Sequence, residues 1–316
     1  MSGEAEMVIR AQSLVKRFPG VTAVKDASFT VQRAELFGFV GPDGAGKTTM
    51  MRMLAAVMKP DEGEIRVEGV DAVARPEDIR RRLSYMPQRF GLYEDLTVDE
   101  NVRFYADVFE VPRKLREERS ARLLAASGMQ DFRDRLAGQL SGGMKQKLGL
   151  ACALIHAPNI VLLDEPTTGV DPVSRRDFWR ILHGLRAQGV TIVISTAYLD
   201  EAERCTRLAL LYRGEIRHCE TPDALRRKLP GQMIVVACDA PQLAPAVRTL
   251  SGVPGVLGVR AVGDAARAMV DDQTLRIPEI ERALIAAGLS HAKVERVPTM
   301  VEDVFLALLQ GEAQQG

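Results

Sequence analysis

The stretch that decides the fold reads Gly41-Pro42-Asp43-Gly44-Ala45-Gly46-Lys47-Thr48-Thr49. It matches the pattern GxxxxGK followed by Ser or Thr, a glycine-rich loop that holds phosphate groups. An apolar run, Glu35–Val40, precedes the loop, and a helical pattern over Lys47–Met58 follows it. Because the loop stands between a strand and a helix, the pattern predicts a binding site for a nucleoside triphosphate.

The residue types of this loop suit an anionic ligand. Glycines let backbone N–H groups turn towards the phosphates, and the N-terminus of the following helix adds positive potential. We expect Lys47 to reach the β- and γ-phosphates and the Thr48 hydroxyl to bind Mg²⁺. The alternative is a glycine-rich turn before a helix that carries a surface lysine.

A second apolar strand, Ile160–Leu163, ends in two adjacent acids, Asp164 and Glu165. Ligands of α/β proteins bind at the carboxyl ends of such strands. We therefore expect Asp164 near Mg²⁺ and Glu165 near the attacking water. The alternative, a solvated acidic strand end, is disfavoured by the presence of the phosphate loop.

A second anion site is predicted in Leu140-Ser141-Gly142-Gly143-Met144-Lys145-Gln146. Ser141 can cap a helix, and the two glycines expose backbone N–H groups at its N-terminus. Ser141 follows Lys47 by 94 residues (141 − 47), and the chain has one phosphate loop. The simplest explanation is that Ser141 binds the nucleotide of a second protomer, with the two protomers paired head to tail across a two-fold axis. An ordinary serine cap is the alternative.

In order and spacing, these motifs resemble the ATP-binding subunits of ATP-binding-cassette (ABC) transporters, over about residues 7–229. The resemblance implies ATP and Mg²⁺ as cofactors and ATP hydrolysis as the activity. It implies that Gln88 contacts Mg²⁺ and the attacking water, and that Asp171 lies at a dimer interface. It also implies that Phe18 stacks on adenine, with a core phenylalanine as the alternative.

The resemblance further implies a helical subdomain, about residues 90–139, that receives a permease's coupling helix. Its Phe90, Leu92 and Tyr93 are either core residues or a docking patch. Two stretches, Gln88–Thr97 and Pro298–Phe305, resemble exporter ATPases that work with ABC-2-type permeases. The implied partners are an integral-membrane permease and a second ABC ATPase subunit, at the cytoplasmic face of the cell membrane.

One position departs from the family pattern. The family has a histidine that contacts the γ-phosphate just after the strand predicted at Val190–Ser195. This chain reads Ser195-Thr196-Ala197-Tyr198-Leu199 there, so Ala197 stands at the histidine position. Loss of one preorganised contact reduces turnover by roughly 10²–10³-fold. Three readings stay open: pairing with a complete second ATPase, substitution by Tyr198 or a water in a slow homodimer, or an Ala197 of little consequence.

The rest of the first region alternates strands and helices, which favours an α/β fold. The resemblance implies that this region, residues 1–229, forms a P-loop ATPase cassette. Its expected parts are a RecA-like core sheet, an antiparallel β layer and the helical subdomain. The β layer is expected from Met7–Val15 and Ala27–Arg33. Further elements are predicted at Val98–Phe109, Lys114–Ser127, Gly142–Ile155, Ser174–Gln188 (helices) and Val190–Ser195 (strand).

After Pro230 the composition changes, with seven basic residues, ten acidic residues and Phe305 as the single aromatic. Residues 230–316 are predicted to form a small α+β domain of order βαββαβ, a ferredoxin-like sandwich. Its second helix is expected to begin at Pro278. A last helix over Met300–Gln310 is expected to carry a capping box from Thr299 and Glu302. The expected role of this domain is regulatory or dimer-stabilising.

Composition excludes several function classes. The chain has 42 basic and 42 acidic residues, which disfavours a general nucleic-acid binder. No apolar run reaches the roughly 18 residues of a membrane span, and no signal peptide is expected. Four cysteines without CxxC spacing indicate reduced thiols, not a disulfide framework or a zinc site.

Overall fold

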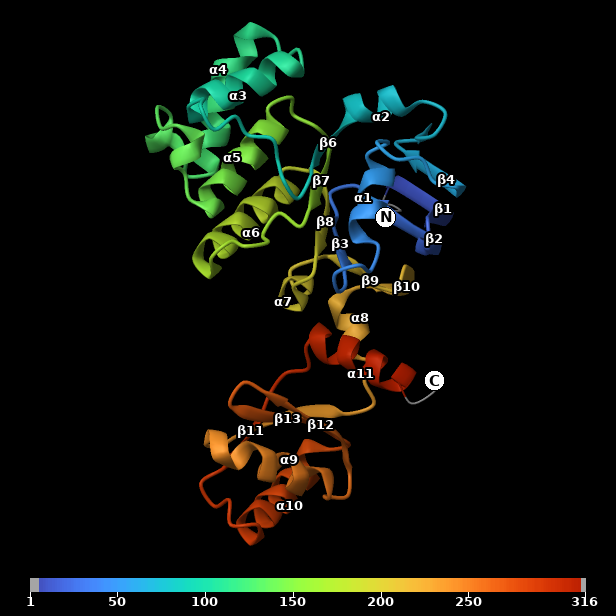
Figure 1. The fold of residues 1–316 in the computed structure, drawn as a ribbon, viewed down its shortest axis with the longest axis vertical. Coiled ribbons are helices and arrows are strands. Elements are labelled where there is room, and N and C mark those ends of the chain that lie inside the picture. The colour runs from blue at the N-terminus through green and yellow to red at the C-terminus, as the bar shows by residue number, and fades with distance from the viewer. Residues whose placement is uncertain (1–5, 314–316) are drawn as a thin grey trace, which may run out of the picture. The chain divides into compact units, whose positions relative to one another are not determined.

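The computed structural model describes residues 6–313. This part of the chain forms two compact units that divide between Pro222 and Asp223. The sequence places the division after Leu229 instead; in the structure it falls within the short helix α8 (Pro222–Arg226). The elements of both units are labelled in Figure 1.

The first unit is built on a six-stranded sheet. Its strands are β3 (Leu36–Val40), β6 (Leu83–Met86), β7 (Ile160–Asp164), β8 (Thr191–Thr196), β9 (Arg207–Tyr212) and β10 (Glu215–Glu220). The order is β10-β9-β3-β8-β7-β6, and all neighbours are parallel except β10 and β9. Strands β3, β7 and β8 are buried at every position, as expected for parallel strands covered on both faces.

An antiparallel sheet of order β2-β1-β4-β5 forms a second layer of this unit. An aromatic cluster joins the layers, because Phe29 lies 5.8 Å from Phe37 and 5.0 Å from Phe39, between ring centroids. Such offset and edge-to-face pairs each add about 0.5–1.5 kcal/mol beyond the burial of their area. The strands are β1 (Met7–Phe18), β2 (Val21–Gln32), β4 (Glu62–Val67) and β5 (Val70–Asp71).

Helix α1 is shorter than predicted. The sequence predicts a helix that reaches Met58, whereas the helix ends at Leu54. Ala56 takes a left-handed conformation (φ 54°), and the N–H groups of Val57 and Met58 both bond to the carbonyl of Arg52. Two N–H groups thus bond to the one carbonyl of Arg52, and the helix closes early. The helices of the first unit are α1 (Lys47–Leu54), α2 (Pro76–Arg82), α3 (Val98–Val108), α4 (Arg113–Ala126), α5 (Gly142–Leu154), α6 (Pro172–Ala187) and α7 (Leu199–Ala202).

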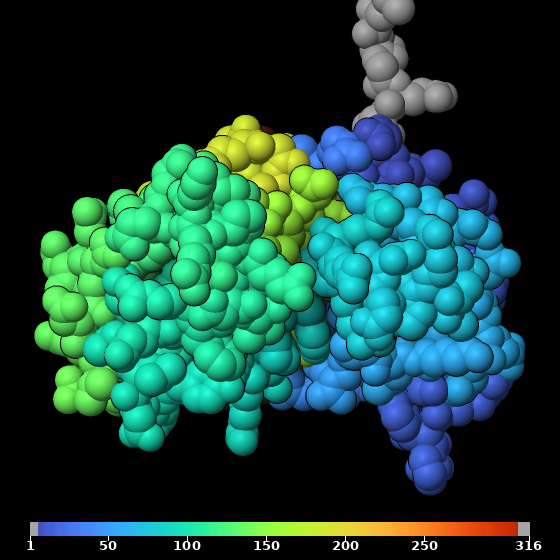
Figure 2. Space-filling view, turned by 90° about the horizontal axis from the view of Figure 1, so that it is seen from above, coloured from blue at the N-terminus to red at the C-terminus, as the bar shows by residue number. Residues whose placement is uncertain are grey.

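Helices α3, α4 and α5 share a separate small core. In Figure 2 the cyan-green to green residues of these helices lie on one side of the face shown, and blue residues from the N-terminal part of the chain lie on the other. Phe90 and Leu92 pack against this core, whereas Tyr93 is 47% exposed. The helical subdomain thus uses residues of α5, beyond the predicted limit at Gln139, and two of the three apolar residues belong to its core.

The second unit has the predicted βαββαβ order. Its antiparallel sheet runs β12-β13-β11-β14, and α9 and α10 supply the helical side of its core. The second helix does not begin at Pro278: Asp272 caps it by accepting from Thr274 and Leu275 N–H, and Pro278 lies inside. The elements are β11 (Gln232–Ala237), α9 (Leu243–Ser251), β12 (Val256–Val262), β13 (Ala265–Val270), α10 (Gln273–Ala286), β14 (Lys293–Arg296) and α11 (Val301–Ala313).

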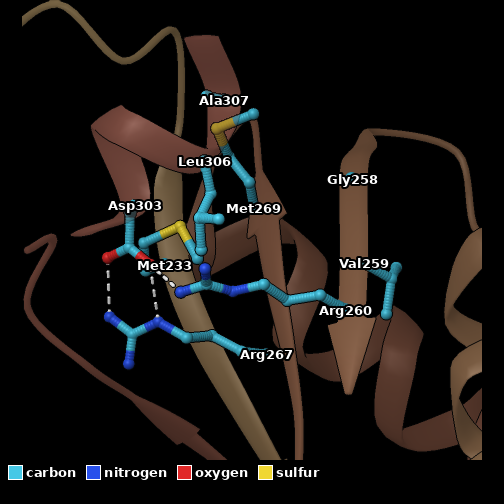
Figure 3. Close-up of a pocket in the computed structure, with 9 residues that line it drawn as sticks. All are labelled: Met233, Gly258, Val259, Arg260, Arg267, Met269, Asp303, Leu306 and Ala307. Carbon is cyan, nitrogen blue, oxygen red and sulfur yellow. Dashed lines mark hydrogen bonds and ion pairs between the residues drawn. The ribbon is translucent and has the colours of Figure 1, made fainter. Parts of the chain in front are cut away.

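An ion cluster fixes α11 within this unit (Figure 3). The buried Asp303 accepts from Arg267 at 2.7–2.8 Å and from Arg260 at 2.5 Å. Its Oδ2 also accepts from the backbone N–H of Met300. The side chain that accepts from the backbone at the start of α11 is therefore Asp303. The predicted capping box of Thr299 and Glu302 is wrong, because Glu302 faces Arg260 instead.

Within residues 6–313, no helix combines the length and apolar character needed to cross a membrane. The four cysteines in this part of the chain are free thiols.

Candidate nucleotide-binding site

The predicted phosphate loop leads from β3 into α1. Gly46 has φ 101°, and a Cβ atom there would lie 2.4 Å from the carbonyl oxygen of Ala23. Only glycine fits this left-handed backbone and this close approach. The loop therefore keeps its curved backbone at the start of α1, where free N–H groups favour an anion.

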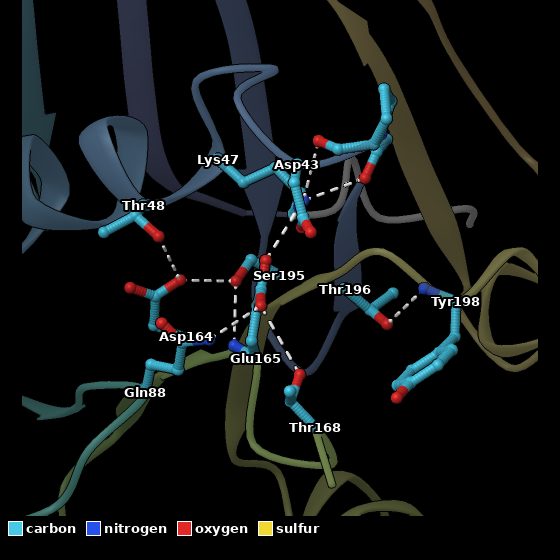
Figure 4. A network of polar contacts seen from close by, with 12 residues as sticks. Asp43, Lys47, Thr48, Gln88, Asp164, Glu165, Thr168, Ser195, Thr196 and Tyr198 are labelled. Carbon is cyan, nitrogen blue, oxygen red and sulfur yellow. Dashed lines mark hydrogen bonds and ion pairs between the residues drawn. The ribbon is translucent and has the colours of Figure 1, made fainter.

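Lys47 stands at the centre of the site and is 3% exposed. Its Nζ donates to the carbonyls of Gly41 (2.8 Å) and Pro42 (3.0 Å), and it lies 3.0 Å from Glu165 Oε1 (Figure 4). The loop's own acid, Asp43, is 3.8 Å from the same nitrogen and has a side chain 92% exposed. The lysine is thus held by strong acceptors at the mouth of the loop.

Asp164 lies beside Thr48. Thr48 Oγ1 donates to Asp164 Oδ1 at 3.1 Å, and Ser195 Oγ donates to the same oxygen at 2.6 Å. Tyr85 donates to Asp164 Oδ2 at 3.3 Å. Burial, then the charge of Asp164, raises the pKa of Tyr85 to about 12, so the phenol stays a donor. Hydroxyl and carboxylate oxygens of this kind suit Mg²⁺, which takes few protein ligands when it also binds phosphates.

Glu165 is held in an uncommon conformation. Its φ is 49°, and its N–H donates to Ser195 Oγ at 2.9 Å and to Ser195 O at 3.1 Å. A left-handed non-glycine residue costs about 1–2 kcal/mol, so its neighbours must hold it in place. Gln88 Nε2 donates to Glu165 Oε2 at 3.1 Å, and Thr168 donates to the same oxygen at 3.4 Å. Gln88 and Glu165, which were both expected near the attacking water, are therefore in direct contact.

A cleft of about 700 Å³ runs along the phosphate loop. Phe18, 39% exposed, lies on its wall, as an adenine-stacking residue would need to. Lys25 and Arg213 also line the cleft and were not predicted. The predicted residues that line it are Phe18, Gly44, Gly46, Lys47, Thr48, Thr49 and Glu165.

The second predicted cradle lies elsewhere. Ser141 caps α5 by accepting from the N–H of Met144, and Ser141 does not belong to the lining of the cleft just described. Gly142 is exposed, while a Cβ atom at Gly143 would come within 2.5 Å of Ser174. Asp171 caps α6 by accepting from the N–H groups of Val173 and Ser174, which lowers the pKa of its carboxyl.

The Tyr198 ring does not fill the position of the missing histidine (Figure 4). Tyr198 follows Ala197, and its ring lies away from Lys47 and Glu165 (Figure 4). The guanidinium of Arg175 stacks over that ring at 4.2 Å from its centroid. In this conformation the Tyr198 side chain therefore does not take the place of the histidine.

Besides Lys25, three residues of the site were not predicted from the sequence: Ser195, Tyr85 and Arg213. Ser195 could have been found, because it is a polar residue at the end of a buried strand, like Asp164. Tyr85 and Arg213 carry no such signal in the chain. Their places depend on how β6 and the β9–β10 turn lie next to the other strands.

The comparisons with known proteins agree with this geometry. A family model described as ABC transporter matches residues 24–168. YbhF of Escherichia coli K12 is named as a probable multidrug ABC transporter ATP-binding protein. It is 41% identical to this chain over 97% of the chain's length. This chain spans 53% of that relative's length.

Two relatives match over nearly their full length. The daunorubicin/doxorubicin resistance ATP-binding protein DrrA of Streptomyces peucetius is 34% identical over 98% of this chain and 94% of its own. The Nod factor export ATP-binding protein I of Rhizobium sp. strain N33 is 35% identical over 98% of this chain and 100% of its own.

Solved structures resemble the first unit. The ATP binding subunit of an ABC transporter is 30% identical, with TM-score 0.63 over 70% of this chain and 92% of its own. The dimeric bacterial ABC transporter cassette MJ0796 is 27% identical, with TM-score 0.62 over 67% of this chain and 98% of its own. The predicted cassette fold is confirmed, and the chain belongs to the ATPase subunits of ABC transporters.

Proposed function

We propose that this chain binds MgATP in the cleft along the phosphate loop and hydrolyses it to power export by a separate membrane permease. The observation that carries the proposal is one cluster: Lys47 beside Glu165, Glu165 beside Gln88, and Asp164 beside Thr48. A lysine, a general base and a pair of magnesium ligands are the parts that phosphoryl transfer requires.

The proposed ligand-binding roles rest on the residues around the cleft. Backbone N–H groups of Asp43–Thr49 and the Lys47 side chain hold the phosphates, while Phe18 stacks on adenine. Thr48, Asp164 and Gln88 hold Mg²⁺, which neutralises charge on the β- and γ-phosphates.

Hydrolysis uses Glu165 as the general base. Its carboxylate takes a proton from a water while the water oxygen bonds to the γ-phosphorus. The bond from that phosphorus to the bridging oxygen breaks, which yields ADP and inorganic phosphate. Lys47 must leave Glu165 for the phosphates at this stage, which frees the carboxylate to accept the proton.

A neighbouring cassette completes each site. Ser141, Gly142 and Gly143 of the neighbour donate to the γ-phosphate, and Asp171 lies at the interface. The exposed Ser141 and Gly142 support this role, because they face solvent rather than this chain's own cleft. Loss of the γ-phosphate removes the bridge between the two cassettes, and the dimer opens.

The permease is proposed from the relatives, whose names refer to drug resistance and Nod factor export. We place the chain at the cytoplasmic face of the cell membrane, bound through its helical subdomain to an ABC-2-type permease. Co-purification from membranes tests this proposal. We expect an integral-membrane protein to accompany the chain; recovery of the chain without any membrane protein would contradict it.

A second candidate function is a weakened ATPase partner in a heterodimer, and Ala197 is the observation that favours it. Because the alanine methyl cannot donate to a phosphate and the Tyr198 ring lies away from the site (Figure 4), the contact that the family's histidine makes to the γ-phosphate is missing. We expect Ala197→His to raise the ATPase rate roughly 10-fold or more, since one preorganised contact contributes about 10²–10³-fold. Steady-state hydrolysis by the purified chain checks it, and an unchanged rate would show that Ala197 does not limit turnover.

A further inference from the structure

A buried carboxylate that the proposed chemistry does not use lies behind the site. Glu201, in α7, has a side chain 1% exposed. A buried charge is costly unless opposite charges and hydrogen bonds compensate it. The contacts that surround Glu201 therefore indicate what the carboxylate is for.

Each oxygen of Glu201 faces a different part of the fold. Oε2 accepts from Thr196 Oγ1 at 2.7 Å and from Thr167 Oγ1 at 3.1 Å. Oε1 accepts from Arg175 Nε at 3.2 Å. Nη2 of the same guanidinium lies 3.2 Å from Oε1 and also donates to the exposed Asp200, at 3.0 Å. All the partners of Glu201 in these contacts are donors, which a carboxylate satisfies and an amide does not.

The partners come from three segments that border the site. Thr196 ends β8 next to Ala197, and its carbonyl accepts from the N–H of Gly41, at the start of the phosphate loop (3.3 Å). Thr167 follows Glu165 by two residues. Arg175 lies in the first turns of α6, just after Asp171. A single carboxylate thus joins the loop after β8, the loop after β7 and the start of α6.

The loop at Ala197 depends on this carboxylate through Thr196. The N–H of Tyr198 donates to Thr196 Oγ1 at 3.0 Å, and that hydroxyl donates onward to Glu201. Arg175, held by Glu201, covers the Tyr198 ring. Both ends of the Ala197 position are therefore fixed by one residue that lies outside the nucleotide cleft.

We propose that Glu201 is a positioning residue for ATP hydrolysis, which holds the loops after β7 and β8 and the start of α6 in register. This role rests on the proposed function. Glu201 touches neither nucleotide nor water in this role; it acts through Thr196, Thr167 and Arg175. Its loss should displace the hydrolytic geometry and leave the phosphate loop's hold on ATP intact.

Glu201→Gln tests the role, with Asp200→Asn as the matched control, because Asp200 binds the same arginine but neither threonine. We expect kcat of Glu201→Gln, counted per ATP-binding chain, to fall roughly tenfold or more, since small misplacements can cost about 10²-fold. The KM for ATP should stay within about twofold, whereas Asp200→Asn should keep both constants. Counting per ATP-binding chain removes the effect of any unfolded fraction.

Thr196→Val provides a second variant should Glu201→Gln fail to fold, because it keeps the side-chain shape and removes only the hydroxyl. We expect its kcat to fall with KM unchanged, by less than in Glu201→Gln. Unchanged kcat in these variants, or a raised KM alone, would overturn the role. A wild-type chain without any ATP turnover would overturn the proposed function as well, which distinguishes the two failures.

Discussion

Lys47→Ala should weaken ATP binding by at least a hundredfold. Lys47 is the one side-chain cation of the phosphate loop, and it is already directed inward, with its Nζ on the carbonyls of Gly41 and Pro42. Charge-assisted hydrogen bonds contribute about 1.5–3 kcal/mol each, and two of them to phosphates correspond to at least a hundredfold in Kd. The substitution also leaves the Glu165 carboxylate, without its cation, facing the anionic ligand.

Isothermal titration of the purified chain with MgATP measures this effect. Lys147→Ala is the matched control, because Lys147 is also partly buried and ion-paired, with Asp177 at 3.3 Å, but lies outside the cleft. The control should bind ATP within about threefold of wild type. A Lys47→Ala chain that binds ATP like wild type would remove the cleft from its proposed role.

Glu165→Gln should stop hydrolysis while ATP stays bound. Glutamine keeps the size and the hydrogen-bonding reach of glutamate, but it cannot accept the proton of the attacking water. General bases contribute about 10²–10⁴-fold, so we expect the turnover rate to fall roughly a thousandfold. Because the γ-phosphate then persists, the two cassettes should stay closed and accumulate as a dimer.

Sedimentation of Glu165→Gln with MgATP and with MgADP separates these effects. The ATP sample should contain dimers, and the ADP sample should contain monomers, because ADP has no γ-phosphate to bridge the cassettes. Near-normal hydrolysis by Glu165→Gln would assign the general base to another residue. The phosphate release rate is measured on the same preparation.

Much of the site was predictable because its motifs are local. The phosphate loop, the acids at the end of β7 and the Ser141 cap each depend on a few consecutive residues. The order of elements in the second unit followed from alternation and turn residues for the same reason. Pro278 misled the prediction there. Asp272, two residues after β13 ends at Val270, caps the helix and starts it earlier, which outweighs the single hydrogen bond that an internal proline removes.

The remaining parts of the site depend on strand register, which a single sequence does not give. Ser195 reaches Asp164 because β7 and β8 pair in parallel with these two residues opposite each other. Tyr85 reaches Asp164 from β6, the neighbouring strand on the other side. The bonds of Glu201 to Thr196, Thr167 and Arg175 likewise join segments that only the folded sheet brings together.

The central claim is that each chain carries two half-sites, and that Ser141 serves the nucleotide of a neighbouring cassette. Ser141→Asp in the Glu165→Gln background isolates this role. Aspartate is as good a helix cap as serine, so α5 keeps its start, but its charge repels a γ-phosphate across the interface.

Molecular mass and bound nucleotide are measured together, in MgATP, on the Glu165→Gln variant and on the double variant that also carries Ser141→Asp. We expect Glu165→Gln alone to form a dimer with one ATP per chain. With Ser141→Asp added, we expect a monomer that still binds one ATP. A double variant that dimerises as before, or that loses its own ATP as a monomer, would contradict the claim that Ser141 completes the neighbour's site.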